Sequence, residues 1–419
     1  MDEGEQSRPA PDWWVTPGLE VRGGRLHVAG RDAEALARSH GTPLFAYDLT
    51  DVRERVIALQ AAFDRSGLGY RVRHALKSQR EPQVLATLRS LGAPGERHAV
   101  GIDACSPGEV KHSLAHGFTP DEISYTGTNV SERDFDVLLA HPIHINVDLL
   151  SQLDRLGRRA PGRRVGIRVN PRISAARPGS GISYYSGERP TKFGIYPEDI
   201  DTALAIAHRH RLEIDTVHFH VTHHLLDDDL PAFERAVGAS ADLVRRVVDA
   251  GHPVQEVNAG GGLGTRFMQT QRPLDLDAYV AVLARHLGPL GVVVSCEPGE
   301  YSTKHSGVLL AEVVTIERRL GETFVGLDAG WNVMHLRFVY HEFVEIVPCR
   351  EPLAPRRGRV SVTGDINEGP DIFAEDYPFP PVKEGEVVAL LGVGSYCQAD
   401  QSTHCLRPWA PAVFFDDRI

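Results

Sequence analysis

The segment YRVRHALK, residues 70–77, begins a series of short apolar runs that decides the fold. Seven more runs follow it, at residues 100–106, 123–127, 144–150, 164–171, 215–221, 254–260 and 292–299. Amphipathic stretches with helical spacing separate them, as in residues 200–207. Regular alternation of strand and helix predicts a parallel sheet covered by helices. Eight strands close a (β/α)8 barrel, which we prefer to an open doubly wound sheet because reactive residue types end most runs.

The pattern changes after about residue 305, where helical spacing fades and VLLAEVVTIERRL (308–320) and EVVALLGV (386–393) read as strands. An α/β fold followed by a β fold is therefore expected. We predict an N-terminal segment over residues 1–40 that packs on the β domain, a barrel over 41–305, and a C-terminal β-sandwich or β-barrel domain over 306–419.

Composition narrows the class of protein. The 419 residues carry a net charge of −11, which argues against nucleic acid as a partner. The acidic, polar start lacks the apolar core of a signal peptide, and no apolar run is long enough to span a bilayer. The five cysteines include no CxxC pair, so we expect no disulfide framework or cysteine-rich zinc site, and a cytoplasmic location.

Lys77 ends the first run and is the leading candidate for covalent chemistry. A buried lysine amine with a lowered pKa forms Schiff bases readily. The competing interpretation is a strand-end lysine whose ammonium reaches solvent. This residue alone does not decide between the two.

Four histidines lie close together on another predicted strand and its exit: His218, His220, His223 and His224. Alternation along a strand places the first two on one face. They predict either a metal site of the HxH type or a histidine stacked on an aromatic cofactor, with a second histidine supporting it. A metal-dependent barrel hydrolase is therefore one alternative, but it leaves Lys77 unexplained.

Two further motifs end predicted barrel strands. The glycine run NAGGGLG, residues 258–264, exposes backbone N–H groups and admits a phosphate closely, although it also fits a tight turn. Glu297, in the motif CEPGE, can hold a protonated pyridine nitrogen or form an ion pair.

Taken in order, these motifs resemble the alanine-racemase-like barrel group of pyridoxal-phosphate enzymes, and within it diaminopimelate decarboxylase and the related ornithine and arginine decarboxylases. The resemblance covers roughly residues 40–400. It implies a TIM barrel followed by a β domain, pyridoxal 5′-phosphate as cofactor and a small amino-acid substrate. It also implies a homodimer in which each active site is completed by the partner's C-terminal domain.

The resemblance also assigns residues. HALKSQ gives Lys77 as the Schiff-base lysine, VHFHV gives His220 as the ring that stacks on the pyridine, and EPG gives Glu297 to the ring nitrogen. The other cofactor contacts that it implies are Asp103, Arg168, His223, Gly260, Gly261, Gly262 and Tyr396. The substrate contacts that it implies are Arg337, Tyr340, Glu368 and Glu300.

Three departures from the family pattern fall at the expected pocket. In the loop GDINEGPD, Asn367 stands where the family has a cysteine that protonates the carbanion, and a carboxamide has no proton of useful acidity. Glu300 replaces the arginine of the family motif EPGR, which reverses a charge near anionic groups. His223 follows Thr222 where the family usually has Gly-Ser.

We therefore predict a decarboxylase of an amino acid or amino-acid derivative that works through a Lys77 Schiff base and a quinonoid. Asn367 would hydrogen-bond the reacting group, with Lys77, His220 or water donating the proton. One alternative keeps the cofactor but ends in epimerisation, β-elimination or oxygen-dependent chemistry. Another is a non-catalytic relative that binds partners, which the retained Lys77, His220 and Glu297 oppose. We expect no metal, nucleic-acid or membrane partner.

Overall fold

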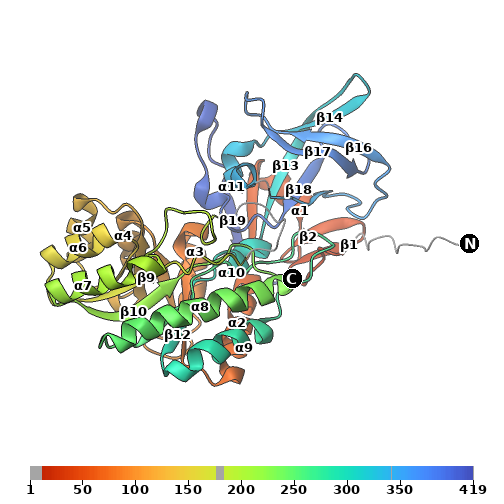
Figure 1. Ribbon diagram of the computed structural model, residues 1–419. Helices are drawn as coiled ribbons and strands as arrows, with labels where there is room; N and C mark the ends of the chain where they lie inside the picture. The colour runs from red at the N-terminus through yellow and green to blue at the C-terminus, as the bar shows by residue number, and fades with distance from the viewer. Residues whose placement is uncertain (1–11, 176–183, 341, 419) are drawn as a thin grey trace, which may run out of the picture. The chain divides into compact units, whose positions relative to one another are not determined.

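The computed structural model describes residues 12–175, 184–340 and 342–418, without the side chains of Leu336 and Arg337. The chain forms two compact units, which Figure 1 colours along the sequence. One unit consists of the described parts of residues 1–52, 266–271 and 303–419, and the other of residues 53–265 and 272–302. Each unit is considered by itself below.

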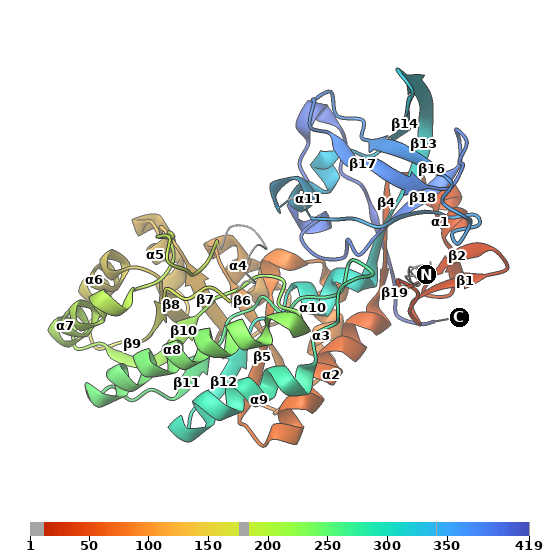
Figure 2. The ribbon, with the colours of Figure 1, turned by 45° about the vertical axis from the view of Figure 1, so that its right-hand side comes forward.

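The second unit is a closed barrel of eight parallel strands, which confirms the predicted TIM barrel (Figure 2). The eight apolar runs of the sequence supply the strands in chain order: β5 (Tyr70–Ala75), β6 (Val100–Ala104), β7 (Ile123–Gly127), β8 (His144–Val147), β9 (Arg164–Val169), β10 (Glu213–Phe219), β11 (Glu256–Asn258) and β12 (Val293–Cys296). Closure pairs β12 with β5. All eight strand ends therefore reach the same rim, where barrel enzymes place their chemistry.

A helix follows each of the first seven strands: α3 (Pro82–Arg89), α4 (Pro107–Ala115), α5 (Glu132–Leu139), α6 (Leu150–Arg159), α7 (Ile200–His210), α8 (Leu230–Asp249) and α9 (Leu276–Leu287). The helix α2 (Leu49–Ser66) leads into β5. Local signals set the helix starts: α4 begins at Pro107, and the Ser106 hydroxyl accepts a hydrogen bond from the Glu109 N–H at 3.1 Å. No helix among the residues described is both long and apolar enough to cross a membrane.

The first unit is rich in strands, as predicted for the C-terminal region. Its main sheet has the order β15-β18-β13-β14-β16-β17, and β4 pairs with both β13 and β19. The strands are β4 (Leu44–Asp48), β13 (Gly307–Arg319), β14 (Glu322–Leu327), β15 (Ile346–Pro348), β16 (Gly358–Thr363), β17 (Ile372–Phe379), β18 (Val387–Leu391) and β19 (Ala412–Phe415). A small antiparallel sheet contains β1 (Leu19–Arg22), β2 (Arg25–Val28) and β3 (Arg31–Asp32). The helices α1 (Ala33–His40) and α11 (His335–Tyr340) also belong to this unit, and the short α10 (Glu300–Thr303) lies at the boundary between the units.

The strand β4 separates two hydrophobic cores within this unit. Phe45 and Tyr47 face one core, whereas Leu44 and Ala46 face the other, as the alternation of side chains along a strand requires. The sequence pattern did not distinguish β4 from a barrel strand. A strand that is buried on both faces reads as a continuous apolar run in either setting.

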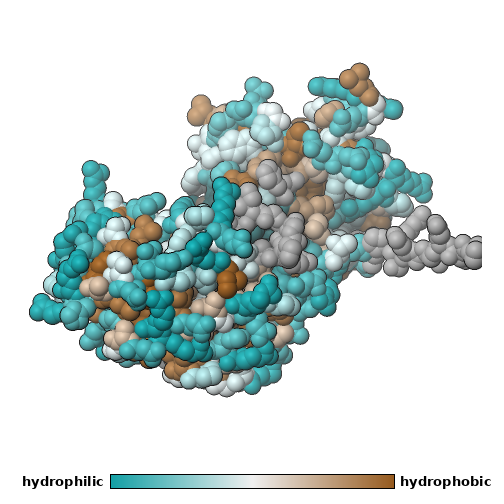
Figure 3. Space-filling model, in the orientation of Figure 1, coloured by the Kyte–Doolittle hydropathy of each residue, from teal (hydrophilic) through white to brown (hydrophobic). Residues whose placement is uncertain are grey.

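Exposed apolar side chains are few in the described residues. The turn between β13 and β14 contains fully exposed Leu320, and a hydrophobic patch marks the tip of this hairpin in Figure 3. Single exposed apolar residues of this kind are normal on a protein surface.

Candidate functional site

Lys77 lies in a short 3-10 turn, Leu76–Ser78, directly after β5. Its Nζ atom is 3.6 Å from Asp103 Oδ2 and 3.3 Å from Cys105 Sγ, both contributed by β6 and its exit. About half of the Lys77 side chain is exposed (49%). The side chain is thus neither fully buried nor free in solvent, and it lies beside the carboxyl group of Asp103.

Asp103 is a buried carboxyl group with incomplete hydrogen bonding. Burial, followed by the charge of Glu297, raises the pKa of Asp103 to about 7, although Lys77 acts in the opposite direction. Its Oδ1 atom is buried and has no hydrogen-bond partner. A buried oxygen of this kind is costly in an isolated protein and marks a position where a ligand can supply the missing partner.

Glu297 follows β12 and is held by two neighbours. Asn258 Nδ2 donates a hydrogen bond of 2.6 Å to Glu297 Oε1, and His218 Nε2 lies 3.4 Å from Glu297 Oε2. Burial alone raises the pKa of Glu297, but the His218 ring and the Lys77 ammonium outweigh burial and hold that pKa well below its usual range. Glu297 is therefore an ionised carboxylate in a buried position.

The ring of His220 is fixed by the glycine run. The Gly261 N–H donates to His220 Nδ1 at 3.1 Å, so a neutral ring carries its proton on Nε2. Burial, then the positive charges of Arg168 and Lys77, hold the pKa of His220 well below its usual range. His220 is consequently a neutral, flat ring beside the ionised Glu297.

The glycine run leaves no room for side chains. Gly260 and Gly262 adopt φ values of 69° and 89°, which favour glycine. A Cβ atom on Gly260, Gly261 or Gly262 would lie 2.4–2.6 Å from a backbone oxygen, that of Phe219, Glu297 or Thr222 respectively. The loop therefore packs tightly on the exits of β10 and β12, with backbone amides near the site.

An aromatic group that sequence reasoning missed flanks His220. The Tyr185 ring meets the His220 ring edge-on, with 4.5 Å between the ring centroids, and stacks on the Phe193 ring with 5.5 Å between the centroids. Arg168 lies over the Phe193 ring at 4.4 Å, and its Nη1 atom is 3.4 Å from Asp148 Oδ1. No sequence signal indicated Tyr185.

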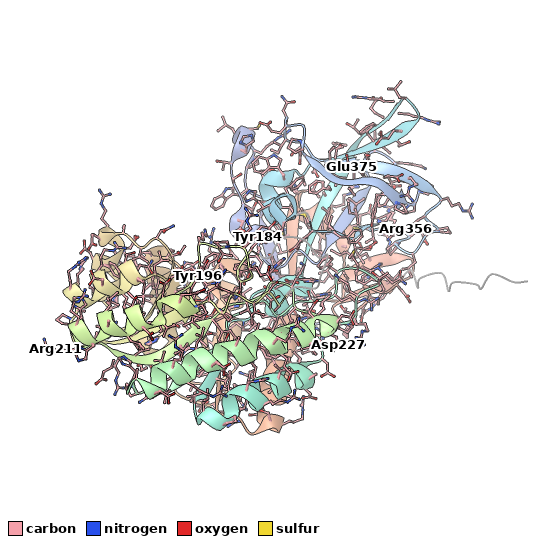
Figure 4. All side chains as sticks on the ribbon, in the orientation of Figure 1. Tyr184, Tyr196, Arg211, Asp227, Arg356 and Glu375 are labelled. Carbon is pink, nitrogen blue, oxygen red and sulfur yellow. The ribbon has the colours of Figure 1, made fainter. Side chains whose placement is uncertain are left out.

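Two other tyrosines between β9 and α7, Tyr184 and Tyr196, are labelled in Figure 4. The ring of His223, predicted at the cofactor, lies 5.9 Å from that of Tyr184 and 6.0 Å from that of Tyr185. Glu300, predicted at the substrate, contacts two barrel residues: its Oε1 lies 2.7 Å from His224 Nδ1 and accepts from the Thr265 N–H at 3.1 Å.

The remaining predicted site residues belong to the first unit. Asn367 and Glu368 are exposed on the loop before β17, and Glu368 Oε1 lies 3.3 Å from His404 Nε2. Tyr396 has a left-handed φ of 56°. Tyr340 ends α11, while the side chain of Arg337 lies outside the described residues.

The barrel, considered by itself, brings nine of the predicted site residues together on its rim: Lys77, Asp103, Arg168, His220, His223, Gly260, Gly261, Gly262 and Glu297. The described residues contain no group of three or more His, Cys, Asp or Glu side chains arranged to hold a metal ion.

Comparisons with known proteins point in one direction. Residues 49–304 match the family model described as pyridoxal-dependent decarboxylase, pyridoxal binding domain. Diaminopimelate decarboxylase of Methanothermobacter thermautotrophicus is 33% identical over 402 residues, covering 94% of this chain and 91% of that protein. The Escherichia coli enzyme of the same name is 29% identical, covering 91% and 90%. The structure of diaminopimelate decarboxylase from Helicobacter pylori complexed with L-lysine superposes with a TM-score of 0.82 at 26% identity, covering 92% and 94%.

Proposed function

The chain belongs to the family of pyridoxal-dependent decarboxylases, and from that premise we propose that the rim of its barrel removes the α-carboxylate of a diamino acid, with Lys77 as the covalent anchor of the cofactor. The enzyme class, the cofactor pyridoxal 5′-phosphate and an amino-acid substrate follow from the family. The residue roles and the diamino-acid preference are the proposed part. The observation that carries the proposal is Lys77 Nζ beside buried Asp103 on the same rim as ionised Glu297.

The residues on this rim fit pyridoxal phosphate. Gly260, Gly261 and Gly262 pack so closely on backbone oxygens of neighbouring segments that only glycine fits, and the resulting loop carries no side chain at these positions that could keep a phosphate away. Asp103 Oδ1 is a buried oxygen without a partner, which a polar group of the cofactor would satisfy. The ionised Glu297 matches a protonated ring nitrogen. When bound, the cofactor acts as an electron sink for the electrons of the breaking bond.

The chain's own residues then divide the work. Glu297 holds a proton on the ring nitrogen, since its lowered pKa keeps it ionised across the physiological range. Neutral His220 offers a flat face without adding charge, and the Gly261 N–H fixes its orientation. Lys77 Nζ, half-exposed on its turn and beside Asp103, would hold the cofactor covalently.

Proton return to the substrate needs a donor. Asn367 is exposed and has no titratable proton, so it cannot fill that role in the described chain. The lowered pKa of His220 leaves almost no imidazolium to donate. Of the donors on the rim, we favour Lys77 Nζ. Because loss of the carboxylate leaves two hydrogens on the reacting carbon, the face of proton delivery becomes visible only when the reaction is run in deuterated water.

We also propose that the protein is a homodimer in which the Asn367–Glu368 loop of one chain completes the site of the other. Mixing Lys77→Ala protein with Glu368→Ala protein tests this arrangement. Restored activity in the mixture, about one quarter of wild type at most if only one site per mixed dimer is intact, supports shared sites. Two inactive variants that stay inactive after verified subunit exchange would contradict it.

The activity itself is tested by incubating holoenzyme with diaminopimelate, lysine, ornithine and arginine while measuring carbon dioxide, ammonia and Cα configuration. The proposal expects stoichiometric carbon dioxide from at least one diamino acid, and none without cofactor. Diaminopimelate comes first because two relatives carry it in their names. Ammonia or racemised substrate without carbon dioxide would replace decarboxylation by a changed outcome. No reaction in a protein that binds the cofactor would favour a binding role.

A further inference from the structure

Glu300 begins α10, three residues after Glu297, yet its carboxylate is committed to two other segments of the barrel. Its Oε1 atom lies 2.7 Å from His224 Nδ1, accepts from the Thr265 N–H at 3.1 Å, and lies 3.4 Å from the Thr265 hydroxyl. The side chains of His224 and Glu300 are 14% and 11% exposed. A contact with this little solvent is weakly screened, so it holds its geometry.

The two segments that Glu300 joins are the exit of the histidine strand and the glycine run. Their backbones are already in register: the Leu225 N–H donates to the Gly262 carbonyl at 2.7 Å, and the Gly264 N–H donates to the Leu225 carbonyl at 3.0 Å. Gly264 lies so close that a Cβ atom there would be 2.9 Å from His224 Nδ1. The imidazole is therefore wedged between the glycine run and Glu300.

His224 has an unfavourable backbone conformation that something must maintain. Its φ is 53°, in the left-handed region that a histidine occupies uncommonly. Such strain persists where surrounding contacts over-determine it. The contact with Glu300 on one side and the close approach of Gly264 on the other both restrain it.

We propose that Glu300 is a positioning residue: through His224 and Thr265 it holds the glycine run against the histidine strand and thereby sets the affinity for the cofactor's phosphate. This assignment rests on the cofactor placement proposed above. It differs from a role in contacting substrate, because Glu300 Oε1 is engaged within the barrel. The strand that carries His220 and the loop that bears Gly260, Gly261 and Gly262 are the two parts fixed.

The test compares the dissociation constants of pyridoxal phosphate and of pyridoxal, which lacks the phosphate, for apo-protein and its variants. Glu300→Gln keeps the size of the side chain but loses its charge, and His224→Asn removes the ring while tolerating a left-handed φ. Asp154→Asn is the matched control, because Asp154 and His210 form a carboxylate–imidazole contact of similar length, with Oδ1 2.8 Å from Nε2, on the outer helices α6 and α7. Thermal unfolding of each variant accompanies the titrations.

We expect Glu300→Gln and His224→Asn each to weaken binding of pyridoxal phosphate roughly tenfold, the size of one charged hydrogen bond, and binding of pyridoxal less than about twofold. The double variant should be no weaker than the single variants, because both remove one contact. Asp154→Asn should leave both constants unchanged. If Glu300 only supported the fold, its substitution would weaken the binding of pyridoxal phosphate and of pyridoxal equally.

Unchanged or tighter binding of pyridoxal phosphate by Glu300→Gln would overturn the proposal, as would an effect confined to the substrate KM. Should Glu300→Gln not fold, His224→Asn decides the matter by the same criterion. Failure of the proposed cofactor site has a separate signature. In that case the wild-type protein itself would bind pyridoxal phosphate no better than pyridoxal, which shows the failure before any variant is compared.

Discussion

Toward the amino-terminal end of the barrel, two opposite charges lie buried against each other. Arg73 on β5 and Glu256 on β11 form an ion pair, with side chains only 6% and 8% exposed. The Ser295 hydroxyl donates to Glu256 Oε1 at 2.6 Å, and Arg71 Nη1 lies 2.8 Å from Glu256 Oε2. Burial raises the pKa of Glu256, but Arg73 outweighs it and lowers that pKa to about 2.

At the opposite rim, β6 and the exit of β12 carry two acidic groups whose charges oppose each other. Asp103 and Glu297 are both buried acids, and the charge of Glu297 helps to raise the pKa of Asp103 to about 7. Asp103 Oδ1 lacks a hydrogen-bond partner, whereas both oxygens of Glu256 have donors.

The difference separates stability from function. Charges that satisfy one another hold the barrel together and leave nothing for a ligand. A buried carboxyl group such as Asp103, which has a raised pKa and an oxygen without a hydrogen-bond partner, costs stability until a ligand supplies that partner. Changes at one end should therefore affect folding and changes at the other should affect the cofactor and turnover.

The largest effect on function is expected from Lys77→Ala. Loss of the covalent anchor should lower turnover by on the order of 10³-fold or more, while thermal stability stays close to that of wild type. Steady-state carbon dioxide release checks the first expectation and thermal unfolding the second. Lys111→Ala, an exposed lysine on α4, serves as the control and should keep full activity.

The largest effect on stability is expected from Glu256→Gln. Removing one partner of a buried ion pair should cost about 3–5 kcal/mol of unfolding free energy, because Arg73 remains buried and uncompensated. Urea unfolding measures this cost.

The pH dependence gives the same pair a second signature. Because the folded pKa of Glu256 is lowered from 4.5 to about 2, its contribution is present above pH 4.5 and is lost as the pH falls toward 2. The stability gap between wild type and Glu256→Gln should therefore narrow over that window. A gap that is constant with pH would contradict the ion-pair account.

Glu297→Gln should lower turnover by on the order of 10²-fold, the usual cost of removing one preorganised charge. The amide cannot hold a proton on the ring nitrogen. Some stability should also be lost, because the lowered pKa of Glu297 means that the folded protein favours its ionised form. Full turnover of this variant, with cofactor bound, would remove Glu297 from the proposed mechanism.

The smallest effect concerns Asp103 in the apo-protein. Its folded pKa of about 7 lies above the ordinary 3.8, so the folded state retains a proton that the unfolded chain releases. Stability contributed by this group is therefore present below pH 3.8 and is lost as the pH rises through 7. Asp103→Asn should become relatively more stable than wild type across this window. Parallel curves for the two proteins, measured by thermal unfolding, would contradict the assigned pKa.

The sequence predicted the barrel well because parallel strands are buried on both faces and leave continuous apolar runs. The same reason explains why β4 was not separated from them. Arg73 and Glu256 were visible as charges within apolar runs, but their pairing joins residues 183 positions apart and left no periodic signal.

The candidate site was predicted in part. Strand ends must share a rim, so Lys77, Asp103 and Glu297 could be brought together from their positions alone. The aromatic contact between Tyr185 and His220 could not, because it depends on the path of a loop rather than on a strand register. The degree of burial of Lys77 could not be predicted for a similar reason, since it depends on the turn after β5.

The most direct measurement is a peptide map after borohydride reduction of the protein incubated with pyridoxal phosphate. The chain has five lysines, so the attachment site is unambiguous. The account predicts that the cofactor mass appears on the peptide containing Lys77 and is absent from the Lys77→Ala protein. Reduction that links the cofactor to another lysine, or to none, would contradict the assignment of the barrel rim as the catalytic centre.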